Sequence, residues 1–87
     1  MAGHDSAFKR HKQSERHRIR NRAVRSRVRT GIRRFLTAVE SQNRETAATQ
    51  LGEVTKLIDT AAGKGVYHRN TAARTKSRLM ARLNAMT

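Results

Sequence analysis

Apolar residues recur at helical spacing along the chain, most clearly in its first half. At 100° per residue, five apolar side chains share a stripe about 80° wide; they are Val24, Val28, Ile32, Phe35 and Val39. Upstream of Val24 polar residues occupy the same stripe, so the N-terminal part of this helix has no apolar face. The pattern predicts one long helix from about Ser6 to about Ser41, of which only the second half packs against other elements.

Two further stretches predict shorter helices. One covers about residues 44–62 and places on one face Ala47, Ala48, Leu51, Val54, Ile58, Ala61 and Ala62. The other covers about residues 68–85 and groups Ala72, Leu79, Leu83 and Met86, with Met80 at the edge of that face. Asn43 is expected to cap the second helix, and Gly63 to take the left-handed conformation at its end.

Three amphipathic helices joined by short turns predict an all-α fold, a three-helix antiparallel bundle. A first helix of about 36 residues is roughly 54 Å long, and the other two cover only about half of it. We therefore expect a single domain over residues 1–87, in which residues 6–23 project as a basic helix and residues 24–87 form the bundle.

The charge of the chain excludes more classes of function than the predicted fold does. The 87 residues include 20 Lys and Arg against 6 Asp and Glu, a net charge of +14. The net charge is +10 over residues 1–34, −2 over residues 35–63 and +6 over residues 64–87. We therefore expect a polyanionic partner. Nucleic acid is the leading candidate, and an anionic membrane surface is the second. The absence of cysteine excludes a disulfide scaffold and a thiolate metal site.

The strongest candidates for phosphate contacts lie on the first helix. Only Asp5 and Glu15 oppose twelve cations within residues 1–34, whereas a solvated helix normally mixes both signs. The candidates there are Lys9, Arg10, Lys12, Arg16, Arg18, Arg20, Arg22, Arg25 and Arg27. A second basic surface is the start of the third helix, whose free N–H groups attract phosphate. Its candidates are Lys64, His68, Arg69 and Asn70, with Arg74 and Arg78 following at i, i+4 spacing.

Other interpretations of the basic segment fit less well. A bZIP-type basic region passes into a long zipper, whereas this chain turns at residues 41–43. A mitochondrial transit peptide is also Arg-rich, but cleavage within residues 24–39 would remove the core. A membrane-surface helix needs bulky apolar residues, and residues 8–22 offer only Phe8 and Ile19.

No catalytic or metal-binding pattern stands out. The four histidines, His4, His11, His17 and His68, lack metal-ligand spacing, and no nucleophile–base set or phosphate-cradling glycine loop can be identified. We expect no enzyme activity, no metal and no cofactor. Charge alone does not choose RNA over DNA.

Two motifs resemble those of the bacterial small-subunit ribosomal protein S20 family. One is Lys64-Gly65-x-x-His68-Arg69-Asn70-x-Ala72-Ala73-Arg74-x-Lys76-Ser77-x-Leu79. The other is Ser6-Ala7-x-Lys9-Arg10-x-Lys12-Gln13-Ser14-Glu15-Arg16, followed by Asn21 and by Arg25-Ser26-x-Val28-Arg29-Thr30. The resemblance covers nearly the whole chain, including its length and turn positions.

The resemblance implies a three-helix bundle that binds 16S ribosomal RNA directly, early in assembly of the small ribosomal subunit, and bridges RNA helices without catalysis. It implies a cytoplasmic ribosomal protein; we expect no membrane partner and no homo-oligomer. The residues that match the family motifs, and are expected to contact RNA, are Lys9, Arg10, Lys12, Arg16, Asn21, His68, Arg69, Asn70, Arg74 and Lys76. The two basic surfaces would hold separate RNA segments. The alternative is a nucleoid-type DNA-binding protein.

Overall fold

The computed structural model describes residues 2–86, with side chains from residue 7 onward. These residues fold into α1 (Ala2–Glu40), α2 (Arg44–Gly63) and α3 (Arg69–Asn84), with no strand among them. The predicted all-α class is therefore confirmed. The ends differ slightly from the expected ones: α1 already begins at Ala2 rather than near Ser6, and His68 precedes α3 instead of belonging to it.

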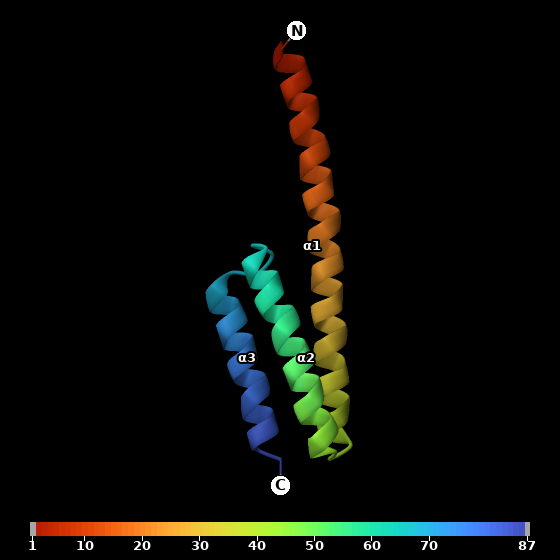
Figure 1. Cartoon of the computed structure of the whole chain (residues 1–87), viewed down its shortest axis with the longest axis vertical. Helices are drawn as coiled ribbons and strands as arrows, with labels where there is room; N and C mark the ends of the chain where they lie inside the picture. The colour runs from red at the N-terminus through yellow and green to blue at the C-terminus, as the bar shows by residue number, and fades with distance from the viewer. Residues whose placement is uncertain (1, 87) are drawn as a thin grey trace.

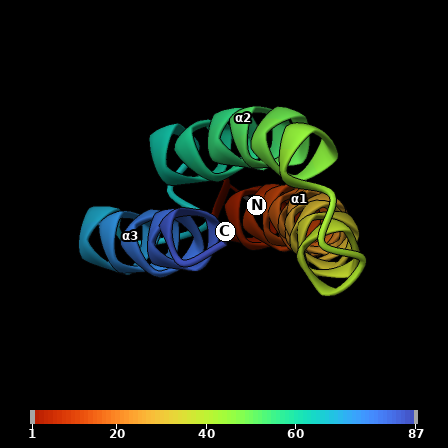
Figure 2. The same ribbon diagram turned by 90° about the horizontal axis from the view of Figure 1, so that it is seen from below.

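The three helices run antiparallel in chain order, with α2 between α1 and α3 (Figure 1). Seen along the long axis, α2 lies over both of the other helices (Figure 2). It is the helix against which each of them packs. The N-terminal half of α1 extends alone beyond the bundle, and the molecule measures 66 × 21 × 13 Å. The predicted bundle with a long projecting first helix is thus confirmed.

The core follows the predicted apolar faces. Phe35, Val54 and Ile58 are fully buried at its centre. Val24 is the first buried residue in the described part of α1, as the loss of the stripe upstream predicts. Ala48 is exposed, so its predicted place in the core is wrong. At 100° per residue it lies about 100° from the centre of the buried face of α2.

The buried face of α3 is the predicted one. Ala72, Leu79 and Leu83 are buried, and Met86 packs partly against the core. Met80, expected at the edge, has 48% of its surface exposed. The exposed arginines Arg74, Arg78 and Arg82 lie on other sides of this helix, whereas Lys76 is half-buried near its edge.

Helices α1 and α2 pack tightly at Gly31, which the apolar pattern did not single out. A Cβ added to Gly31 would lie 3.0 Å from Val54 Cγ2 and 3.3 Å from Leu57 Cδ1. A larger side chain would push the two helices apart. The glycine therefore allows the tight contact that buries Val54.

The turn after α1 is compact and caps both helices that it joins. The backbone N–H of Gln42 donates to Val39 O at 3.0 Å, and that of Asn43 donates to Ala38 O at 3.1 Å. Gln42 adopts a positive φ of 59° to make this Schellman turn. The Asn43 side chain accepts from the N–H of Thr46 at 3.1 Å, which confirms the predicted N-cap.

Helix α2 ends in the same way, but not at the glycine that the sequence suggested. Gly65 has the positive φ, 77°, whereas Gly63 is the last residue of the helix. The N–H groups of Gly65 and Val66 donate to Ala62 O and Ala61 O at 3.1 and 2.9 Å. Burial of Val66 beside this turn favours the later end, so the expected cap at Gly63 is corrected to Gly65.

Candidate nucleic-acid interface

The cations of the projecting helix lie on its outer surface. All nine that the sequence predicted as phosphate contacts on α1 are exposed; they are Lys9, Arg10, Lys12, Arg16, Arg18, Arg20, Arg22, Arg25 and Arg27. Asn21, predicted from the motif, is half-buried. Because the part of α1 before Val24 lies beyond the bundle (Figure 1), most of its cations face solvent, although Arg20 also reaches the segment between α2 and α3.

Acidic partners are scarce along α1. Arg18 Nη2 lies 2.9 Å from Glu15 Oε2, the one ion pair that α1 forms among the side chains described. The two side chains are 75% and 43% exposed, so solvent screens the pair and it adds little stability. The rest of the positive charge on the described part of α1 has no acidic partner among the side chains that the structure describes.

Arg20 joins α1 to the segment that links α2 and α3. Its Nη2 donates to Lys64 O and to Asn21 Oδ1, both at 3.3 Å. Arg20 and Lys64 belong to the two different basic surfaces that the sequence predicted. The fold brings an edge of each together at this corner, although the residues are 44 positions apart.

The start of α3 presents polar groups as the sequence predicted, with one of them already engaged. His68 is the N-cap, and its Nδ1 accepts from the backbone N–H of Asn70 at 3.1 Å. The neutral imidazole then carries its proton on Nε2, which remains available as a donor. Arg69 and Asn70 are exposed beside it.

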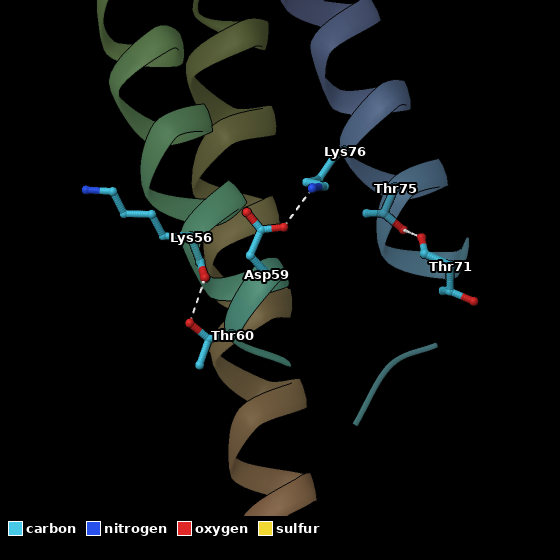
Figure 3. A network of polar contacts seen from close by, with 6 residues as sticks. All are labelled: Lys56, Asp59, Thr60, Thr71, Thr75 and Lys76. Atoms are coloured by element: carbon cyan, nitrogen blue, oxygen red, sulfur yellow. Dashed lines mark hydrogen bonds and ion pairs between the residues drawn. The ribbon is translucent and has the colours of Figure 1, made fainter. Parts of the chain in front are cut away.

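Lys76 is held differently from the other predicted cations. Its Nζ lies 2.6 Å from Asp59 Oδ1, so the pair links α3 to α2 (Figure 3). Only 35% of the Lys76 side chain is exposed. Arg74 and Arg78 on the same helix are exposed and form no ion pair with a described acidic residue. On α3 these arginines are therefore more accessible to phosphate than Lys76.

Three further arginines share the properties of the predicted site. Arg29, Arg33 and Arg34 are exposed, and continue the arginine rows of α1 toward its C-terminal end. Arg33 and Arg34 also line a surface hollow of about 430 Å³ beside the start of α2. Arg29 and Arg33 follow Arg25 by four and eight residues, and Arg34 follows Arg27 by seven; this helical spacing is the sequence signal that could have added them.

Two other classes of site find no support in the described residues. They contain no group of three or more His, Cys, Asp or Glu side chains placed to hold a metal ion. In the part of the chain that the structure describes, no helix is both long enough and apolar enough to span a bilayer.

Comparison with known proteins agrees with this arrangement. A family model described as Ribosomal protein S20 matches residues 2–84. The small ribosomal subunit protein bS20 of Syntrophobacter fumaroxidans is 48% identical over 86 residues, which cover 99% of this chain and 100% of the relative. The protein of the same name from Clostridium perfringens is 48% identical over 86 residues, 99% of each chain. That of Nitratidesulfovibrio vulgaris is 49% identical over 84 residues, 97% of each chain.

Proposed function

The chain belongs to the ribosomal protein S20 family, and we propose that it binds 16S ribosomal RNA directly and bridges RNA helices during assembly of the small ribosomal subunit. It is a structural constituent of the ribosome rather than an enzyme, and it acts in the cytoplasm as part of the small subunit. The mechanism is neutralisation of phosphate charge by surfaces of fixed shape.

One observation carries the proposal: among the side chains described, most of the positive charge has no acidic partner. Of 20 Lys and Arg residues, Arg18 and Lys76 alone form ion pairs with acidic groups among the side chains described. So dense a field of like charge is unfavourable in the isolated protein. Phosphate groups of RNA relieve this repulsion, and counterions released from the RNA add to the driving force.

The proposed contacts fall on both basic surfaces. On α1 they are Lys9, Arg10, Lys12, Arg16, Arg18, Arg20, Asn21, Arg22, Arg25 and Arg27. On the link and α3 they are Lys64, His68, Arg69, Asn70, Arg74, Lys76 and Arg78. Helix α2, which carries three acidic residues against two cations, lies between α1 and α3 (Figure 1). A single domain in which residues 6–23 reach outward and residues 24–87 form the base can therefore hold two RNA segments at a fixed separation.

Matched lysine variants test the proposal. Lys9→Gln on α1 and Lys64→Gln on the link each remove one proposed phosphate contact. Each is expected to weaken binding to 16S ribosomal RNA several-fold. Each should also reduce the slope of log affinity against log salt by the amount that one phosphate contact contributes. Filter binding over a salt series measures both quantities.

Lys56→Gln is the control, because Lys56 is an exposed lysine on α2 outside both surfaces. It removes the same charge and should change the affinity by less than about twofold. Equal losses for all three variants would mean that net charge, rather than these surfaces, drives binding. Equal affinity of the unmodified chain for 16S ribosomal RNA and for DNA would contradict the proposed RNA partner.

A further inference from the structure

A stripe with few charges runs along the outer side of α1. At 100° per residue, Phe8, Ile19, Ser26 and Thr30 fall within about 40° of arc. They lie on the side of α1 opposite the buried Val24. Phe8 and Ile19 are 60% and 64% exposed, and both hydroxyl residues are exposed. The stripe extends over about 33 Å at 1.5 Å per residue.

A row of arginines lies on each side of this stripe. The centre of each row is about 80–90° from the centre of the stripe, measured around the helix axis. One row consists of Arg16, Arg20 and Arg27, and the other of Arg18, Arg22, Arg25 and Arg29. All seven are exposed. The outer side of α1 is thus a band of apolar and hydroxyl side chains, interrupted by Lys12 at the same angle as Thr30, between two parallel lines of positive charge.

The two hydroxyls of the stripe have unused hydrogen-bonding capacity. Elsewhere, the Thr49 and Thr60 hydroxyls donate to a carbonyl one turn earlier in their own helix, at 3.1 and 2.9 Å. Ser26 and Thr30 make no such bond to any residue that the structure describes. Both line a surface hollow of about 270 Å³ that Arg27 also lines. A ligand seated there can exchange hydrogen bonds with both.

We propose that this side of α1 docks along the shallow groove of an A-form RNA duplex. The inference rests on the proposed RNA binding and specifies which RNA element this surface takes. The shallow groove of A-form RNA is wide and displays ribose 2′-hydroxyls between two phosphate strands. The two arginine rows meet the phosphates of the two strands. The stripe meets the riboses, and Ser26 and Thr30 exchange hydrogen bonds with 2′-hydroxyls.

Other nucleic acids match the surface less well. Single strands bind on series of aromatic side chains, and Phe8 is the one aromatic residue of the stripe. Lys12 Nζ already lies 4.8 Å from the centre of its ring, which leaves one ring face for a base. The minor groove of B-DNA is about 6 Å wide and excludes a helix about 10–12 Å across, whereas its major groove admits one. The feature that separates RNA from DNA on this surface is therefore the 2′-hydroxyl, which DNA lacks.

Acidic groups limit how far the duplex extends. Glu53 on α2 lines the far wall of the hollow beside Ser26 and Thr30, so phosphates cannot advance over α2 there. Glu15 lies near the stripe, and its charge is offset by Arg18 at 2.9 Å. The docking surface is therefore confined to the part of α1 between Phe8 and Thr30.

The test compares a short RNA duplex with a DNA duplex of the same sequence, using the full chain at physiological salt. The RNA duplex is expected to bind at least about tenfold more tightly. Substituting 2′-deoxyribose in the RNA strands should remove most of that preference. A preference below about threefold, or tighter binding to single-stranded RNA than to the duplex, would overturn the inference.

A variant pair isolates the hydroxyls. Ser26→Ala combined with Thr30→Val changes no charge, and is expected to lower affinity for the RNA duplex about three- to tenfold, with an unchanged salt slope and unchanged DNA binding. Thr49→Val is the control, since that exposed hydroxyl already bonds to its own helix. No loss in the double variant, or an equal loss in the control, contradicts the docking mode.

The outcomes separate this inference from the proposed function. If 16S ribosomal RNA binds but duplex RNA and DNA bind alike, the docking mode alone fails. If 16S ribosomal RNA itself does not bind, the proposed function fails and the docking mode with it.

Discussion

Two residues with positive φ, Gln42 and Gly65, determine where α1 and α2 end. Glycine adopts this left-handed conformation without a steric penalty, whereas the Cβ of any other L-residue crowds the following carbonyl. Gly65 therefore suits its turn, and Gln42 is strained in an otherwise equivalent one. The difference gives a pair of substitutions with opposite expected effects.

Gln42→Gly is expected to raise the free energy of unfolding by about 0.5–1 kcal/mol, because relief of strain outweighs the added freedom of the unfolded chain. Gly65→Ala is expected to lower it by about 1 kcal/mol. Urea unfolding followed by circular dichroism at fixed salt measures both. Destabilisation by Gln42→Gly would show that its side chain contributes more than its backbone costs.

Leu79 and Arg74 lie on the same helix but differ in burial. Leu79 is in the core and Arg74 is exposed. Leu79→Ala should cost about 2–5 kcal/mol and unfold much of the population. Arg74→Ala should leave the melting temperature nearly unchanged and still weaken RNA binding. Thermal melts and binding assays on both variants decide whether the faces of α3 are correctly assigned. If the Arg74→Ala variant unfolded and the Leu79→Ala variant stayed folded, the assignment of the buried and exposed faces would be wrong.

At the scale of the elements, α1 divides near Val24. C-terminal to Val24, the helix is held against the bundle by the buried residues Val28 and Phe35. N-terminal to Val24, no described residue is fully buried, and the hydrogen bond from Arg20 to Lys64 O is the one polar contact with the bundle among the described residues. Like charges along the projecting part repel one another, so its backbone hydrogen bonds have little tertiary support.

Hydrogen exchange should therefore divide α1 into two parts. Amides of residues 8–18 are expected to exchange with little protection in the free protein, and those of residues 28–38 slowly. Addition of 16S ribosomal RNA should protect the first group most, since the phosphates remove the repulsion. Strong protection of residues 8–18 without RNA would show that the projecting helix is stable by itself.

For the whole molecule, periodicity was sufficient to predict the class, the order and the approximate length of the helices. The apolar stripe that begins at Val24 also predicted where the core begins. The C-terminal cap of α2 was harder to predict, because the choice between Gly63 and Gly65 depends on how Val66 packs after the helix. The tight approach at Gly31 depends on Val54 of another helix and is equally invisible along the sequence.

The candidate site, like the fold, could be predicted from the sequence only in part. Cation-rich surfaces could be predicted because charge and helical spacing are properties of the sequence. The pairing of Lys76 with Asp59, and the contact of Arg20 with Lys64, join residues 17 and 44 positions apart and depend on the tertiary fold. These contacts decide which predicted cations are fully free to meet phosphate.

The salt dependence of binding to 16S ribosomal RNA tests phosphate neutralisation most directly. With about 8–12 phosphate contacts, log affinity should fall with log salt at about 0.7–0.9 per contact, a slope of roughly −6 to −11. Double-filter binding of the full chain from low to moderate salt measures it. A slope in that range is the predicted result, and a slope shallower than about −3 would contradict binding by charge neutralisation.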